Sequence, residues 1–178
     1  MTEEPDVRWR TAVAADLPFI EAAELDYVRA REPGQEAAWL AAADRNRRLW
    51  AENLTRTTVA EVGGAPVGYG MWAVLDGTAT VVTLHVAPAH RRRGLGRRLL
   101  AAVEDDVRRS GHDLLELGVH RDNPARRVYE SAGFALTGED GDYLLFRRDV
   151  AQPASATRSA SQSGSGSRAR GNRRSSSA

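Results

Sequence analysis

Residues 79–110 constrain the fold more than any other part of the chain, because they change character twice. Residues 80–86 are mostly β-branched or apolar, which predicts a buried strand, and Pro88 ends it because proline has no N–H for a strand ladder. A basic turn follows, and leucines and valines then recur at helical spacing up to Ser110. The stretch therefore predicts a strand, a glycine turn and a helix.

The turn at residues 91–96 reads RRRGLG and has the features of an anion site. Gly94 and Gly96 allow the backbone to approach a ligand without a Cβ in the way. The first N–H groups of the following helix lack intrahelical partners and lie at the positive end of its dipole. The turn is therefore predicted to bind a phosphate or pyrophosphate group.

Three known phosphate-binding patterns can be compared with this turn. A Walker A loop needs Gly-Lys-Ser/Thr, and the chain has no lysine. A Rossmann fingerprint needs a small residue where Leu99 stands and an acid that ends the next strand, whereas Glu116 lies inside its strand. The pattern Arg/Gln-x-x-Gly-x-Gly/Ala is matched by Arg91, Gly94 and Gly96. An ordinary arginine-rich turn is the structural alternative.

Hydrophobic periodicity and turn residues predict the other elements. Strands are expected at residues 7–13, 57–62, 66–75, 113–120 and 143–150 and from residue 134, and helices at about 17–31, 35–54 and 123–132. The acidic run Glu104-Asp105-Asp106 is expected to form the solvated face of the central helix.

In its turn motif and in this order of elements, the chain resembles the GNAT (Gcn5-related N-acetyltransferase) superfamily over about residues 7–149. The resemblance implies a mixed α/β (α+β) fold, the GNAT acyl-CoA N-acyltransferase fold. Its sheet is mostly antiparallel, with six to seven strands, helices on both faces and a splayed central parallel pair. It also implies acetyl-CoA as co-substrate, with the pyrophosphate held by the turn.

A second segment of residues 123–134 is similar to the family's Asn…Tyr-Glu…Gly-Phe segment. There the asparagine contacts the CoA arm and the tyrosine protonates the leaving thiolate, which implies these roles for Asn123 and Tyr129. The interval between them is six residues instead of the usual seven. Either the loop is one residue shorter or Asp122 takes the asparagine position. The alternative for Tyr129 is a packed helix residue.

The resemblance also implies a set of site residues. The strand before the turn supplies backbone N–H groups for the developing oxyanion, and the turn and the second segment bind the cofactor. The expected cofactor-binding residues are Leu84, His85, Val86, Arg91, Arg92, Arg93, Gly94, Leu95, Gly96, Arg97, Asn123 and Tyr129. Two candidates for the general base stay open, Glu116 on the strand before the tyrosine helix and His85 on the central strand.

The inventory of reactive residues argues against other chemistries. The chain has no cysteine, and residues 1–150 contain two serines, neither in a Gly-x-Ser-x-Gly elbow. No His-Glu-x-x-His motif or similar ligand cluster occurs, so no metal is expected.

Composition divides the 178 residues into a domain at 1–150 and a Ser/Arg/Gly-rich basic tail at 151–178. The tail has five arginines and no acid, and we expect it to be disordered because it lacks large apolar residues. Nucleic acid is expected to bind, if at all, through this tail. The start of the chain lacks the apolar core of a signal peptide, and no apolar run could span a membrane, so we expect a cytoplasmic location.

Two hypotheses follow from the resemblance. The first is an N-acetyltransferase that uses acetyl-CoA and acts on a primary amine of a small molecule or peptide. The second is a non-catalytic module that binds an acyl-CoA or a protein partner. Residues 1–54 hold 11 acids, and Glu139, Asp140 and Asp142 add three, which favours a cationic acceptor. The oligomeric state, monomer or homodimer, is left open.

Overall fold

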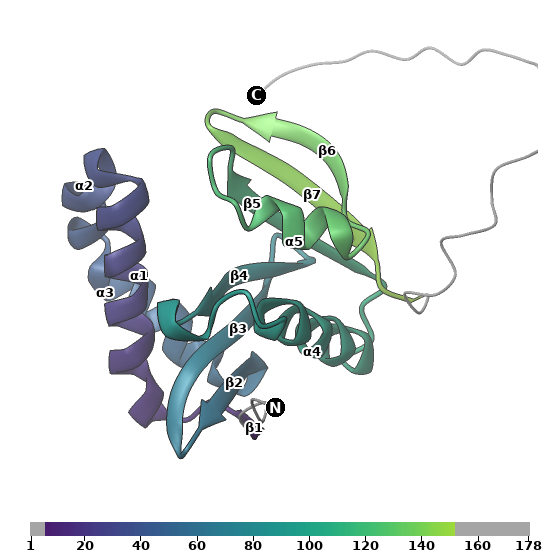
Figure 1. The fold of residues 1–178 in the computed structure, drawn as a ribbon. Helices are drawn as coiled ribbons and strands as arrows, with labels where there is room; N and C mark the ends of the chain where they lie inside the picture. The colour runs from purple at the N-terminus through teal and green to yellow at the C-terminus, as the bar shows by residue number, and fades with distance from the viewer. Residues whose placement is uncertain (1–5, 152–178) are drawn as a thin grey trace, which may run out of the picture.

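A seven-stranded sheet with the order β1-β2-β3-β4-β5-β7-β6 runs through the computed structural model, which describes residues 6–151 (Figure 1). Every neighbouring pair is antiparallel except β4–β5, so the mostly antiparallel sheet implied by the resemblance is confirmed. Apart from Ala151, the tail predicted at residues 151–178 lies outside the described residues. The strands are β1 (Val7–Thr11), β2 (Thr57–Val62), β3 (Ala65–Leu75), β4 (Thr78–Val86), β5 (Leu114–His120), β6 (Ala135–Asp140) and β7 (Tyr143–Asp149).

Five α-helices lie among the described residues: α1 (Leu17–Arg31), α2 (Glu36–Ala41), α3 (Ala43–Glu52), α4 (Leu95–Arg109) and α5 (Arg126–Ser131). The prediction of one helix at residues 35–54 is wrong, because the chain turns at Ala42. The break accompanies the packing of Trp39 against Trp50, whose ring centroids are 6.3 Å apart. None of these described helices is both long enough and apolar enough to cross a membrane.

The helices cover the two faces of the sheet, as expected. α4 and α5 pack on one face and bury a core that includes Trp72, Leu100, Leu115 and Phe146. The helices α1 and α3 pack on the other face around Ile20 and nearby residues of β2 and β3 (Figure 1). On the α4 face, Leu95 and Leu99 also pack against Ala60 and Val67, so α4 covers β2 and β3 as well. Each face of the sheet therefore has its own apolar layer.

The only parallel pair among the described strands, β4–β5, also has the fewest paired residues. β4 pairs with β5 at Ala79↔Leu115 and Thr80↔Glu116 and nowhere further along. Beyond these residues β4 stays paired with β3, and β5 stays paired with β7. The two central strands thus diverge toward their carboxyl ends, which confirms the splayed pair and opens a wedge between them.

The acidic run Glu104-Asp105-Asp106 does not form a solvated face as predicted. Glu104 is 8% exposed, and its carboxylate accepts a hydrogen bond from Arg148 Nη1 at 2.6 Å. The carboxylate of Asp106 accepts one from Trp72 Nε1 at 2.7 Å, and Asp105 alone is exposed. β7 and β3 bring these partners from distant parts of the sequence, so the helix uses two of its acids to bind the sheet.

Gly68 on β3 is expected to be intolerant of a side chain. A Cβ there would lie 2.8 Å from the carbonyl oxygen of His85 on the paired strand. Because this contact is with backbone, the strands would have to separate, and we expect Gly68→Ala to lower the free energy of unfolding by about 1–3 kcal/mol. Urea denaturation tests this, with Gly34→Ala, which meets nothing within 4 Å, as the matched control. Equal midpoints for the two variants would contradict the expected overlap.

Candidate active site

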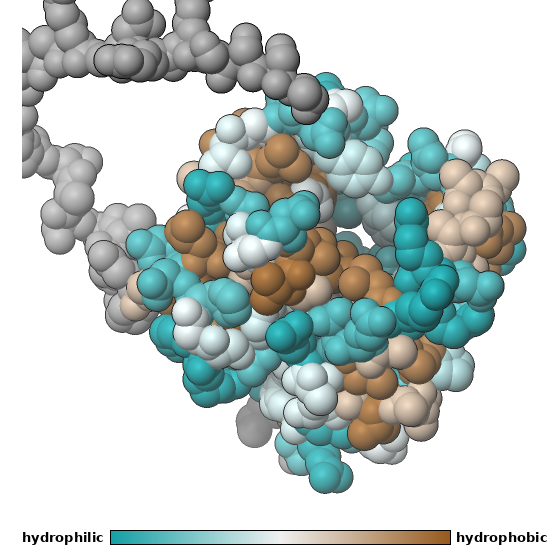
Figure 2. All heavy atoms as spheres, turned by 180° about the vertical axis from the view of Figure 1, so that it is seen from behind, coloured by the Kyte–Doolittle hydropathy of each residue, from teal (hydrophilic) through white to brown (hydrophobic). Residues whose placement is uncertain are grey.

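A pocket of about 170 Å³ fills the wedge between β4 and β5. In Figure 1, α1 lies beside the end of β4 and stands apart from β5 and β7, and the surface seen from behind is hollowed between the N-terminal helices and the rest of the molecule (Figure 2). Its walls come from α1, β4, β5, β7 and the start of α5. The lining residues are Glu24, Tyr27, Glu32, Val81, Val82, Thr83, Leu84, His85, Leu117, Gly118, Val119, His120, Asn123, Tyr129 and Tyr143.

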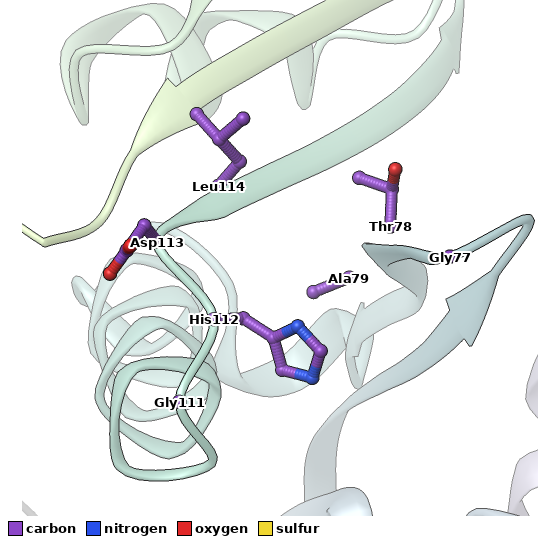
Figure 3. Close-up of a pocket in the computed structure, with 7 residues that line it drawn as sticks. All are labelled: Gly77, Thr78, Ala79, Gly111, His112, Asp113 and Leu114. Carbon is purple, nitrogen blue, oxygen red and sulfur yellow. The ribbon is translucent and has the colours of Figure 1, made fainter.

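A second hollow, of about 220 Å³, lies at the opposite ends of the same two strands. Residues 77–79 and 111–114 line it, and His112 points its ring toward Ala79 (Figure 3). The strands are still paired there, and none of the predicted site residues belongs to its lining. The wedge, which brings several of the predicted site residues together, is therefore the candidate functional site.

The predicted phosphate turn has a backbone that leaves its N–H groups free. Arg92 and Gly94 adopt positive φ angles of 61° and 75°, and α4 begins at Leu95. Within the described part of the chain, the backbone N–H groups of residues 92–97 donate to no backbone acceptor. Successive free N–H groups at a helix N-terminus form a cradle for an anion.

The side chains of the turn have distinct positions. Arg92 and Arg93 are exposed, whereas Leu95 is buried against β3 and β2 and anchors the start of α4. Arg91 Nε donates to the carbonyl oxygen of Val86 at 2.8 Å, and Arg97 donates to Ser131 Oγ on α5 at 3.1 Å. The arginines thus frame the turn.

Gly96 is not required by internal packing. A Cβ at this position would meet only Val86 Cγ2, at 3.8 Å, which is ordinary contact. Its lack of a side chain leaves open space above Val86 at the first turn of α4. That space is what a bound diphosphate needs.

Tyr129 projects from α5 into the pocket and is 6% exposed. Its ring packs edge-on against Phe134, with centroids 6.0 Å apart, and no group among residues 6–151 forms a hydrogen bond with its hydroxyl. Burial, with Tyr27 and Glu24 nearby, raises the pKa of Tyr129 to about 12. The hydroxyl is therefore protonated at neutral pH and free to donate.

Asn123 also lines the pocket, whereas the side chain of Asp122 is 86% exposed. The Nδ2 atom of Asn123 donates to the Tyr27 hydroxyl at 3.0 Å, and its Oδ1 accepts from the Ala125 N–H at 2.9 Å. Of the two residues left open by the sequence, Asn123 is the one that lies at the pocket.

The two predicted bases have different surroundings. His85 lies in the pocket, where its ring stacks on Tyr69 with centroids 5.5 Å apart. Burial, with Arg91 nearby, lowers the pKa of His85 to about 4, so its ring is neutral at pH 7. Glu116 is not among the pocket-lining residues and forms an ion pair with Arg147 of β7. The structure thus brings Leu84, His85, Asn123 and Tyr129 together and leaves Glu116 outside.

A carboxylate that the sequence analysis did not single out lies on the α1 wall of the pocket. Glu24 Oε1 accepts hydrogen bonds from the Tyr69 hydroxyl, at 2.7 Å, and from the Thr83 hydroxyl. Burial raises the pKa of Glu24, although both hydrogen bonds act in the opposite direction. Just after the end of α1, Glu32 Oε2 accepts from the Tyr143 hydroxyl at 2.8 Å. No local pattern distinguishes these two acids from the others in the first 54 residues.

Comparisons with known proteins identify the family of the chain. A family model described as "Acetyltransferase (GNAT) family" matches residues 20–134. The L-methionine sulfoximine/L-methionine sulfone acetyltransferase of Salmonella typhimurium is 37% identical over 87 residues, which are 46% of this chain and 51% of that protein. The L-amino acid N-acyltransferase MnaT of Escherichia coli is 33% identical over 104 residues, 53% of this chain and 60% of that protein. The matches thus span about half to three fifths of these relatives.

Solved structures show the same fold. The paia N-acetyltransferase of Thermoplasma acidophilum in complex with coenzyme A superimposes with a TM-score of 0.69 at 16% identity, over 81% of this chain and 99% of that one. The yncA structure of Salmonella typhimurium with acetyl-CoA gives a TM-score of 0.62 at 23% identity, over 82% and 94%. At these identities the likeness concerns the fold alone.

Proposed function

Since the chain belongs to the GNAT acetyltransferase family, we propose that it is an acetyl-CoA-dependent N-acetyltransferase. It would transfer the acetyl group to a primary amine by direct attack within a ternary complex. One observation carries this proposal: a wedge between two splayed strands combines a free phenol, that of Tyr129, with an adjacent anion-binding turn. Two kinds of similar protein support the proposal. The two named relatives are an acetyltransferase and an N-acyltransferase. The two solved structures contain coenzyme A or acetyl-CoA.

The turn at residues 91–97 would hold the pyrophosphate of the co-substrate. Its free backbone N–H groups and the start of α4 provide donors and a positive dipole, and its arginines add charge. The thioester would then extend into the wedge beside Leu84, His85 and Val86. There the backbone of β4 no longer pairs with β5 and has N–H groups available for a developing oxyanion.

Tyr129 would act as the general acid. When the carbon–sulfur bond breaks, the thiolate needs a proton, and the hydroxyl of Tyr129 is protonated at neutral pH and without an internal partner in the described chain. His85 is a poor base because of its low pKa and would serve to shape the pocket. Asn123 would hold Tyr27 and the start of α5 in place next to the co-substrate arm.

We propose a cationic amine without a neighbouring carboxylate as acceptor. The pocket lining contains two carboxylates, Glu24 and Glu32, and several aromatic rings, but no arginine. Such a lining attracts an ammonium group and repels an anion. A free amino acid would place its carboxylate in this acidic environment.

The amide of an L-amino acid is therefore expected to be a better acceptor than the free amino acid. We expect kcat/KM to be at least about tenfold higher, corresponding to about 1.4 kcal/mol of avoided repulsion. Thiol release from acetyl-CoA, measured for matched pairs of amino acid and amide, tests this preference. A preference for the free acid would show that the carboxylate has a cationic partner in the complex.

The same assay with a wider panel of amines tests the function itself. Thiol release that depends on both the amine and the protein would support the transferase. Calorimetric binding of CoA with no thiol release for any amine would instead favour the alternative, a non-catalytic module that binds an acyl-CoA or a protein partner. Absence of CoA binding would contradict both the transferase and the module that binds an acyl-CoA, and would leave only the module that binds a protein partner.

A further inference from the structure

We propose that Glu24 is the general base that removes a proton from the acceptor's ammonium group. This assignment rests on the proposed acetyl transfer and adds a catalytic residue to it. Glu24 projects from α1 into the same wedge that receives the Tyr129 hydroxyl from α5. The base and the acid would thus approach the reacting carbon from two different elements.

Two hydrogen bonds fix the orientation of the Glu24 carboxylate. Its Oε1 atom accepts from the Tyr69 hydroxyl on β3 at 2.7 Å and from the Thr83 hydroxyl on β4. Tyr69 is fully buried and Thr83 is half-buried, so both donors are held by the sheet. A carboxylate held in this way loses little freedom when it accepts a further proton donor.

The second oxygen, Oε2, receives no hydrogen bond from the described residues. Because Glu24 lines the pocket, this oxygen is the one available to a ligand. An ammonium group has three donors and would satisfy it. The arrangement divides the carboxylate into an oxygen used for positioning and an oxygen free for the proton.

The surroundings of Glu24 also suit a base. Burial raises its pKa. The polar groups that bind it or line the same pocket include no arginine; they are Tyr27 from α1, Glu32 just after α1, Tyr69 from β3, Thr83 and His85 from β4, His120 from β5, Asn123, Tyr129 from α5 and Tyr143 from β7. A carboxylate with a raised pKa is a stronger base for an ammonium group near neutral pH. Glu24 and Tyr129 are also within electrostatic reach, because the charge of Glu24 contributes to the raised pKa of Tyr129.

The proton balance of the reaction is complete with these two residues. Glu24 takes one proton from the ammonium, and the nitrogen lone pair forms the N–C bond with the thioester carbonyl. The carbon–sulfur bond then breaks, and the sulfur takes the proton of Tyr129. The second proton of the nitrogen restores the Tyr129 hydroxyl, and Glu24 releases its proton to water.

Glu24→Gln tests the assignment, because the amide oxygen can still accept from Tyr69 and Thr83 but cannot take a proton. With an alkylamine that is protonated at the assay pH, we expect the single-turnover rate to fall by about 10²–10³-fold with unchanged CoA affinity. With a weakly basic amine that is already neutral at that pH, the loss of rate is expected to be at least tenfold smaller than with the protonated amine. The matched control is Glu21→Gln on the same helix, where the carboxylate pairs with Arg47 outside the pocket, and its rate should equal that of the wild type.

The outcomes separate this inference from the proposed function. A Glu24→Gln rate within about twofold of wild type for the protonated amine would overturn the assignment of Glu24 and leave the transferase intact. An equal loss for both kinds of amine would also overturn it, because it would indicate a structural role. Absence of thiol release by the wild-type protein would overturn the proposed function and the assignment with it.

Tyr69→Phe gives a second test that does not remove the carboxylate. The hydroxyl of Tyr69 stabilises the ionised form of Glu24 and lowers its pKa. Its removal should raise that pKa, so the acid limb of the pH–rate profile should move to higher pH. Wild-type activity should itself fall as the pH drops through the pKa of Glu24, and this limb should be absent in Glu24→Gln. An acid limb that is identical in wild type, Tyr69→Phe and Glu24→Gln would overturn the proposal.

Discussion

Replacing Tyr129 by phenylalanine is expected to slow acetyl transfer by about 10²–10⁴-fold while acetyl-CoA binding hardly changes. The substitution keeps the ring, which packs against Phe134 in the core, and removes only the hydroxyl. No described group forms a hydrogen bond with this hydroxyl, so its loss leaves no buried partner unsatisfied. The fold should therefore be retained, and the whole effect should fall on the chemical step.

Single-turnover kinetics with CoA affinity measured alongside is the appropriate experiment for Tyr129→Phe. The rate constants kcat and kcat/KM should fall together, because the proton is donated only in the transition state. Since thiolate is a fair leaving group and water can enter the space, we expect the lower end of the range. Tyr143→Phe is a useful contrast, since its hydroxyl binds Glu32 at the rim, and its effect should be less than tenfold. Equal rates for Tyr129→Phe and wild type would leave Tyr129 as a packing residue.

Gly96→Val is expected to abolish CoA binding, with at least a hundredfold loss of affinity, while the domain still folds. The new side chain would stand in the space beside the free N–H groups of the turn, where the pyrophosphate is proposed to bind. Ordinary contact with Val86 at 3.8 Å indicates that the fold accepts a Cβ here. Gly94→Val should have the same effect on binding, but its φ of 75° adds backbone strain and a loss of stability.

Calorimetry with CoA and thermal melting, carried out on the same samples, distinguish these effects. Arg91→Ala provides the graded comparison, because it removes a charge but leaves the backbone of the turn in place. We expect it to weaken CoA binding by about 1.5–3 kcal/mol, the range for one charge-assisted hydrogen bond. Unchanged affinity in Gly96→Val at an unchanged melting temperature would exclude the turn as the pyrophosphate site.

Much of the fold could be predicted from the sequence because its signals are local. Within residues 79–110, the apolar pattern changes from that of a strand to that of a helix on either side of the glycine turn. Strand β2 begins and ends at the predicted residues, 57 and 62. The hairpin turns between β2 and β3 and between β3 and β4 lie at Gly63-Gly64 and Asp76-Gly77, residue pairs that are typical of such turns, and all four residues have positive φ angles. The break at Ala42 was missed because no glycine or proline marks it, and tertiary packing of the two tryptophans accompanies it.

The candidate site also has parts that local sequence patterns predicted and parts that only the folded chain reveals. The turn at residues 91–96 and the segment around Tyr129 are continuous motifs, so the sequence alone indicated them. The surroundings of the charged side chains could not be predicted from local motifs, because their partners lie far away in the sequence. Glu104 is paired with Arg148 of β7, 44 positions away. Glu116 lies where β5 is still paired with β4, before the wedge opens, and forms an ion pair with Arg147 of β7.

Glu24 shows most clearly what only the tertiary structure decided. Its partners Tyr69 and Thr83 are 45 and 59 positions away, on strands that meet α1 only in the folded chain. In the sequence it is one of the 11 acids among residues 1–54. Its burial, its fixed orientation and its proximity to Tyr129 arise from the packing of α1 over β3 and β4. The sequence thus determined the strand, turn and helix of residues 79–110 by local periodicity and glycine positions, whereas the proposed protonation chemistry depends on contacts between distant residues.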